Sequence, residues 1–285
     1  MVPTVDFFGT KLSRMILGDN PFNGGSYIKE VRSGKEMKEF YTEDVILRAL
    51  HEAEANGVNG YMALAEPFIL RTLYHFRAQG GKMNIVFQSY PAIDLSINLR
   101  QMLECEPVGI YFQGTTFDNM YEKEQYGEIR EKLKMIRDAG VAVGFGTHMP
   151  EAVLRAEHEG WEADFYSVCL YNARRYNRGR ESGFITGKSN DLVFYPGDPE
   201  FMFAAIKEVK KPCIAFKIYA GGQIFVGKPP EEVPAIAENA IREAYANIKP
   251  TDVICLGIFQ KYKDELRENI EIVNKVLRGE CNCEK

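Results

Sequence analysis

The sequence predicts a single (β/α)8 TIM barrel, because short apolar runs alternate with helical segments along the whole chain. Several of these runs are nearly continuous, as in Val141–Phe145 and Val253–Leu256, which is typical of parallel strands covered on both faces. The chain has 285 residues, and one barrel domain of about 250 residues fits this length. We therefore expect one domain over residues 1–285. Strands are expected at 13–19, 58–65, 83–89, 108–113, 141–147, 164–171, 212–218 and 252–258.

An open, doubly wound sheet is the alternative fold. Such a sheet usually has fewer strands and a Gly-rich first turn of the form G-x-G-x-x-G. No such motif follows the expected first strand. Eight strands, each followed by a helix, close more simply into a barrel.

Helix boundaries are marked by capping residues, glycines and prolines. Thr42 begins one helix that ends before Gly57, and Pro150 suits the first turn of another. Two long connections, 20–41 and 172–197, both follow strands, so we expect them at the carboxyl-terminal face, where barrel active sites form. Helices are expected at 42–56, 121–139, 150–159, from 198 onward, at 230–247 and at 261–277.

Composition excludes some classes of function. The net charge is −5 without a basic block, which argues against a nucleic-acid binder and a polybasic membrane anchor. No apolar run approaches the roughly 20 residues of a membrane span, and residues 1–10 lack the features of a signal peptide. We therefore expect a cytoplasmic protein whose partner is a small molecule.

Six cysteines occur in the chain. Cys105, Cys169, Cys213 and Cys255 lie in apolar or helical patterns and are expected to be reduced and buried. Cys281 and Cys283 near the end of the chain would suit a soft metal, although such a terminal pair is more often a mobile end.

Polar residues follow all eight expected strands. Side chains at these positions face the mouth of a barrel, and buried polar groups without a role are costly, so the sequence predicts a ligand-binding mouth. The expected acid–base residues are Asp19, His148 and Lys217. The expected substrate-binding residues are Asn20, Glu66, Gln88, Gln113 and Asn172, and Gln260 ends the last strand.

Alternatives stay open for the two basic residues. His148 suits a general base or a metal ligand, or it simply forms hydrogen bonds at a helix start. Lys217 suits a Schiff base or a contact to an anionic substrate, or it forms a salt bridge to Asp19 or Glu66. Asp19, Glu66 and His148 together form a candidate site for a divalent metal.

The connection after the sixth strand is rich in arginine. Arg174 and Arg175 suit carboxylate or phosphate groups of an anionic substrate or nucleotide. A solvated charged loop explains the same pattern.

From about residue 140 the chain resembles the aldo-keto reductase family. The resemblance is carried by residues 140–153, by 166–172 with its terminal Tyr-Asn, by 215–228, and by 252–257 with Arg267-Glu268-Asn269 on the next helix. It implies an NADP site in which Phe216 stacks on nicotinamide, Gly221 and Gly222 approach phosphate, and Asn269 contacts adenine.

The catalytic residues of that family are absent. Met62 stands where the resemblance places an Asp, Pro67 near the Tyr, Gln88 at the Lys and Gln113 at the His. Neutral glutamines cannot do acid–base work. Gly146-Thr147 and Val168 also replace polar residues of the nicotinamide site.

The sequence therefore predicts an enzyme that acts on a small polar metabolite, anionic or sugar-like, through an undetermined reaction. One alternative is an NAD(P)-dependent oxidoreductase with rearranged catalytic residues. Another is a non-catalytic or metal-binding barrel.

Overall fold

Eight parallel strands close into a barrel in the computed structural model, which describes residues 1–172 and 194–281. This confirms the predicted (β/α)8 fold and excludes the open sheet. Each strand lies within its predicted range. In order around the barrel the strands are β3 (Met15–Gly18), β4 (Gly60–Leu64), β5 (Asn84–Gln88), β6 (Gly109–Phe112), β7 (Ala142–Thr147), β8 (Phe165–Cys169), β9 (Cys213–Phe216) and β10 (Val253–Gly257), which pairs with β3.

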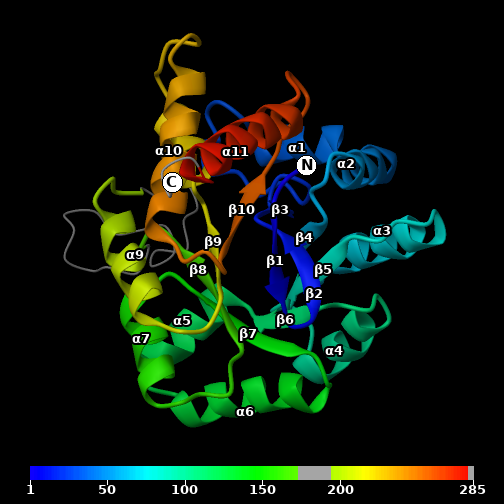
Figure 1. The fold of residues 1–285 in the computed structure, drawn as a ribbon. Coiled ribbons are helices and arrows are strands. Elements are labelled where there is room, and N and C mark those ends of the chain that lie inside the picture. Colours follow the sequence, from blue (N-terminus) through cyan, green and yellow to red (C-terminus); the bar gives the residue numbers. More distant parts are fainter. Residues whose placement is uncertain (173–193, 282–285) are drawn as a thin grey trace.

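Helices surround the strands (Figure 1). Their apolar faces pack on the outside of the barrel, where most of the core lies. The outer helices are α2 (Glu43–Ala55), α3 (Pro67–Ala78), α4 (Leu95–Leu103), α6 (Tyr126–Asp138), α7 (Pro150–His158), α9 (Asp198–Glu208), α10 (Val233–Asn247) and α11 (Glu265–Cys281). None of the helices in the described part of the chain is long and apolar enough to cross a membrane.

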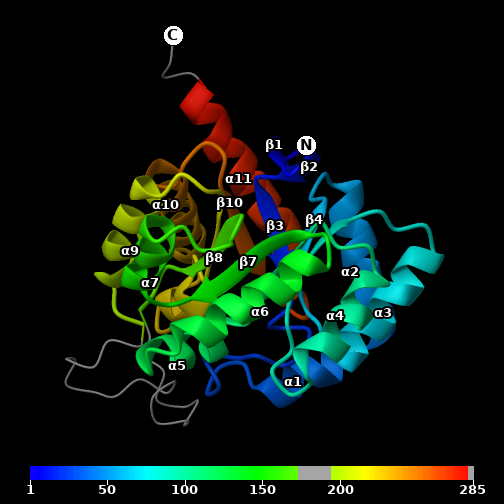
Figure 2. The ribbon, with the colours of Figure 1, turned by 90° about the horizontal axis from the view of Figure 1, so that it is seen from below.

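The helix predicted at 121–139 starts too early, because its first two residues belong to a separate helix that was not predicted. α5 (Gly114–Glu122) ends early and α6 begins only at Tyr126. Glu124 between them has a φ of 57°, a left-handed conformation that a continuous helix cannot contain. Together with α1 (Gly34–Phe40), which forms within the predicted connection 20–41, α5 lies at the carboxyl-terminal end of the barrel, opposite the N-terminus (Figure 2). We call this end the mouth.

A hairpin that the sequence analysis missed closes the other end. β1 (Thr4–Phe7) and β2 (Thr10–Ser13) are antiparallel and joined by Phe8-Gly9, both with positive φ, as a tight two-residue hairpin turn requires. Phe7 packs its ring 5.3 Å from that of Phe165. Apolar side chains fill the barrel interior next to this hairpin, so the interior is a packed core and not a pore. These side chains include Ile16, Met62, Val86, Tyr111, Ile214 and Val253.

The four cysteines expected in the core are free and buried, as predicted: Cys105, Cys169, Cys213 and Cys255. Cys281 ends α11, and Cys283 lies outside the described residues. Metal binding by the terminal pair stays a prediction.

Candidate active site

His148 and Lys217 meet at the mouth. His148 follows β7 directly and Lys217 follows β9 directly, with β8 between these strands. His148 Nε2 lies 3.4 Å from Lys217 Nζ. Two of the three predicted acid–base residues are therefore neighbours, although 69 positions separate them in sequence.

Asp118 on α5 fixes the orientation of His148. Its Oδ2 accepts a hydrogen bond from His148 Nδ1 at 2.7 Å, and its Oδ1 accepts one from Thr147 Oγ1 at 2.5 Å. All three side chains are buried. Since a carboxylate only accepts, Nδ1 carries a proton, and Nε2 is the ring nitrogen directed toward Lys217.

Lys217 sits among aromatic rings on a left-handed backbone. Its φ is 62°, a conformation that costs a side-chain-bearing residue about 1–2 kcal/mol. Nζ lies 4.6 Å from the ring centre of Tyr27, 5.1 Å from that of Phe194 and 5.6 Å from that of Phe216, which suits a cation. Burial lowers the pKa of Lys217, but Tyr27 and Cys169 outweigh burial and raise it, so Lys217 is an ammonium group.

Cys169 at the end of β8 completes this group. β7 and β8 run in register, with Thr147 opposite Val168, so that Cys169 is level with His148. The two side chains form a hydrogen bond. Burial lowers the pKa of His148, but the Cys169 sulfur and the bond to Asp118 prevail over burial and Lys217 and raise it.

Asp19, the third predicted acid–base residue, lies apart on the β3 side of the mouth. Its Oδ2 accepts hydrogen bonds from the backbone N of Leu64 at 2.5 Å and from Asn23 Nδ2 at 3.3 Å. Burial raises its pKa to about 7. The Tyr61 hydroxyl is also buried and has no hydrogen-bond partner in the described part of the chain. Asp19 is thus a carboxyl group that titrates near neutrality.

Several predicted substrate-binding residues have structural roles. Glu66 caps α3 by accepting from the backbone N of Phe68 and Ile69, and Gln113 caps α5 in the same way. The remaining predicted positions also have partners: Gln88 accepts from Tyr111 Oη at 2.8 Å, Asn20 donates to Tyr27 Oη at 3.1 Å, and the backbone N of Asn172 donates to Asp198 at 3.1 Å.

The predicted metal ligands do not converge. Glu66 is engaged at the start of α3, and His148 is engaged with Asp118. Within residues 1–172 and 194–281, no group of three His, Cys, Asp or Glu side chains is placed to hold a metal ion. The predicted salt bridge from Lys217 to Asp19 or Glu66 is not among the ion pairs of these residues either. Arg174 and Arg175 lie outside the described residues.

The residues predicted to hold NADP have roles within the chain. Gly221 has a φ of 60°, and a Cβ there would lie 2.6 Å from Tyr27 Cδ2, so this glycine allows Tyr27 to pack over Lys217. Gly222 packs similarly against Ile28. Asn269 is buried and accepts a hydrogen bond from Tyr219 Oη at 2.7 Å.

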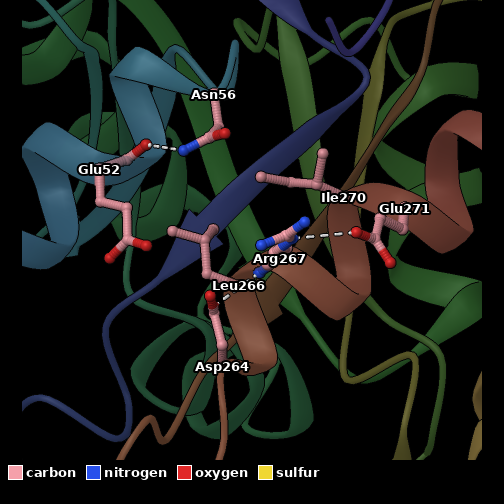
Figure 3. A pocket seen from close by; sticks show the side chains of 7 residues that line it. All are labelled: Glu52, Asn56, Asp264, Leu266, Arg267, Ile270 and Glu271. Atoms are coloured by element: carbon pink, nitrogen blue, oxygen red, sulfur yellow. Dashed lines mark hydrogen bonds and ion pairs between the residues drawn. The ribbon is translucent and has the colours of Figure 1, made fainter.

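A cavity of about 380 Å³ lies between residues of α2 and of α11, and its lining contains none of the mouth residues described above (Figure 3). Arg267 is bound to Glu271 at 3.0 Å, and Asn56 donates to the backbone O of Glu52 at 2.8 Å. These polar side chains of the cavity thus bind neighbouring protein groups, and we assign the cavity no function. It is lined by Glu52, Asn56, Asp264, Leu266, Arg267, Ile270 and Glu271.

No protein-family model and no curated protein sequence matches the chain. Solved structures share the fold. One is a truncated form of 3-deoxy-D-arabino-heptulosonate 7-phosphate synthase from Thermotoga maritima, with a TM-score of 0.56 and 12% identity over 99% of this chain and 93% of that chain. Another is the Yersinia pestis dihydropteroate synthase, with a TM-score of 0.53 and 10% identity over 99% of this chain and all of the other. At such low identity these similarities show a TIM barrel and nothing finer.

The predicted aldo-keto reductase membership is wrong. The similar structures reported above are synthases, and no family model matches the chain. The motifs behind the prediction are strand ends and glycine turns, which barrels need for packing: Gly146, for example, would place a Cβ 3.0 Å from the backbone of Gly114. The oxidoreductase alternative depended on the same resemblance, and the comparisons do not support it.

Sequence reasoning missed three residues of the mouth. Asp118 lies one turn into α5, a helix that was not predicted, although an acid shortly after a strand end was a usable signal. Tyr27 was hidden in a long connection without a pattern. Cys169 was interpreted only as a core residue, because a cysteine in an apolar strand gives no sign of its neighbours.

Proposed function

We propose that the chain is an enzyme that acts on a small anionic metabolite at the mouth of the barrel. The observation that carries the proposal is the Asp118–His148–Lys217 chain of contacts, with Nδ1 2.7 Å from Asp118 and Nε2 3.4 Å from Lys217. A buried acid that orients a histidine beside a partly buried cation is costly for folding alone, and such groups cluster at functional sites.

Each residue has a distinct expected role. Lys217 attracts a carboxylate or phosphate of the substrate, or stabilises an oxyanion, because it keeps its charge among the aromatic rings. Its raised pKa argues against a resting Schiff-base amine, which must be neutral to attack a carbonyl. His148 transfers a proton at Nε2, and Asp118 holds the ring in the tautomer that this requires.

Asp19 supplies a second titratable group at the same end of the barrel. With a pKa of about 7, it is suited to give or take a proton near neutral pH. Its fixed bond to Leu64 also ties β3 to β4. We place it as a secondary candidate for acid–base chemistry.

The test is ligand binding that depends on Lys217. The wild-type protein and Lys217→Met are screened by thermal unfolding against sugar phosphates, 2-oxo acids and inorganic phosphate, since a ligand that binds only the folded state raises the melting temperature. We expect at least one anion to stabilise the wild type and not the variant.

Lys211→Met is the matched control. Lys211 precedes β9 at the opposite end of the barrel, and its Nζ also lies over an aromatic ring, 5.6 Å from the centre of Tyr166. This variant should lose similar stability while keeping ligand stabilisation. If no anion distinguishes the wild type from Lys217→Met, the proposed function is wrong.

A further inference from the structure

The proposed function leaves Cys169 without a task. Its thiol is buried, hydrogen-bonded to His148 and close to Lys217. The strand register brings these side chains together, because three adjacent strands end level with one another, at His148, at Cys169 and at Phe216-Lys217. Four chemically active groups, Asp118, His148, Cys169 and Lys217, therefore share one site.

The surroundings of the sulfur favour its ionised form. Burial raises the pKa of Cys169, but Lys217, His148 and the backbone N–H of Tyr171 outweigh burial and hold the pKa below its usual value. The other buried cysteines behave in the opposite way: burial raises the pKa of Cys213 to about 12, and it raises that of Cys255 far above the usual value. Low-pKa cysteines beside cationic groups are the reactive ones.

We propose that Cys169 is a catalytic nucleophile that attacks the carbonyl carbon of a small anionic substrate, with His148 as its acid–base partner and Asp118 as the residue that positions His148. This inference rests on the proposed function, since it needs a ligand at the mouth. It narrows the substrate to a carbonyl compound that carries a carboxylate or phosphate.

The step balances without a further reactant. The Sγ electron pair forms the C–S bond while the carbonyl π bond breaks and its pair moves to oxygen. Lys217 stabilises the developing oxyanion, which then takes the proton from His148 Nε2 to give a hemithioacetal or hemithioketal. The reverse transfer regenerates the thiolate. The side chains of Phe216 and Lys217 are partly exposed, and they mark the side from which a substrate would approach.

The reactivity of the thiol tests the proposal without knowledge of the substrate. The folded wild-type protein is treated with iodoacetamide between about pH 6 and pH 9, and labelling of each cysteine is followed by peptide mass spectrometry. We expect Cys169 to react at least about tenfold faster than Cys213 and Cys255 near pH 6.5, because one unit of pKa changes the thiolate fraction about tenfold. Equal rates for the three cysteines would overturn the proposal.

Two variants separate charge from simple exposure. Lys217→Met and His148→Gln should each slow the labelling of Cys169 about tenfold near pH 6.5, because each removes a group that opposes the effect of burial on the thiol pKa. In both variants the rate should still increase toward pH 9, as the thiolate fraction grows. A variant that only opened the site would speed labelling at every pH, and that result would count against the nucleophile. Lys211→Met is again the control and should leave the rate at the wild-type value.

An anionic carbonyl probe tests the substrate class. Bromopyruvate alkylates a thiolate as sulfur displaces bromide, and we expect its rate with Cys169 to saturate with concentration, as binding before reaction requires. The neutral iodoacetamide should not saturate. Slow labelling of Cys169 together with Lys217-dependent anion binding would overturn the nucleophile and leave the proposed function standing. Fast labelling without such binding would support the nucleophile and overturn the anion site.

Discussion

Asp118 on α5 accepts a 2.7 Å hydrogen bond from Nδ1 of His148 at the end of β7, and both side chains are buried. The same carboxylate accepts from the backbone N of His148 at 3.2 Å and from Thr147 Oγ1 at 2.5 Å. One acid therefore anchors the strand end, the ring and the hydroxyl before it. The orientation of His148 depends on a helix that lies across the mouth, not on the barrel strand alone.

Asp118→Asn should weaken both the fold and the site. An amide cannot accept all of these hydrogen bonds, so one buried donor loses its partner, and we expect the free energy of unfolding to fall by about 1–3 kcal/mol. The pKa of His148 should fall as well, because the bond to Asp118 raises it. Urea unfolding and NMR titration of the ring protons, assigned with His148→Gln, measure the two effects.

Asp164→Asn is the control for this prediction. Asp164 precedes β8 at the opposite end of the barrel, where it binds Arg137 at 2.7 Å and the backbone N of Val143 at 2.8 Å. Its loss should destabilise the protein without changing the titration of His148. An unchanged His148 pKa in Asp118→Asn would show that the carboxylate does not control the ring.

The strands of the barrel could be predicted because each is a short apolar run between turn residues. The N-terminal hairpin could not, since β1 and β2 have four residues each and carry polar side chains such as Thr4, Asp6, Thr10 and Lys11. The hairpin closes the barrel because Phe7 and Leu12 pack against the barrel interior, and this contact joins segments that are distant in the sequence.

The site was predictable only in its strand-end members. His148 and Lys217 stand out because a polar residue directly follows an apolar run. Their contact with Asp118 and Tyr27 depends on how α5 and the connection after β3 fold over the mouth, which no local pattern specifies. Glu66 and Gln113 were predicted to bind substrate for a related reason. Both follow strands, and the sequence pattern did not show that their side chains cap the next helix.

The stability of the protein should depend on pH through Asp19. Its pKa in the folded state is about 7, against an ordinary value of 3.8. The folded state thus holds this proton more tightly, and the stability that the neutral carboxyl contributes is complete below about pH 4 and is lost as the pH rises through about 7. Relative to Asp19→Asn, we expect the wild type to lose on the order of a few kcal/mol of unfolding free energy across this range.

Urea unfolding at several pH values measures this difference between wild type and Asp19→Asn. Asp94→Asn is the control: the hydrogen bonds from Ser96 lower the pKa of Asp94, so its contribution is present above about pH 4 and should stay constant from there to pH 8. A flat difference for Asp19→Asn as well would mean that Asp19 is ionised throughout.

Lys217 should trade stability for function. Because its φ is 62°, Lys217→Gly should be more stable than Lys217→Ala by roughly 1 kcal/mol, since glycine adopts this backbone without strain. Neither variant should bind an anion. At Lys211, whose φ is not positive, the order should reverse, with the alanine variant more stable by about 0.4–1 kcal/mol. Thermal unfolding of the four variants tests this prediction. The same order of stability between glycine and alanine at both positions would exclude backbone strain at Lys217.

Gly221 should control the aromatic ring that covers Lys217. In Gly221→Ala the new methyl group would lie 2.6 Å from Tyr27 Cδ2, on a backbone with a φ of 60°. Gly227→Ala has a similar φ of 73° but nothing within 4 Å of the new methyl group. Both variants place alanine on a backbone with positive φ, so the difference in their stability measures the clash with Tyr27 alone. We expect Gly221→Ala to be less stable than Gly227→Ala by about 1–3 kcal/mol, as overpacking typically costs.

Because Tyr27 must move away from the Lys217 ammonium, Gly221→Ala should also lose the anion binding that Gly227→Ala keeps. Equal melting temperatures and equal ligand stabilisation in the two variants would show that the packing of Tyr27 on the glycine turn has no part in the site.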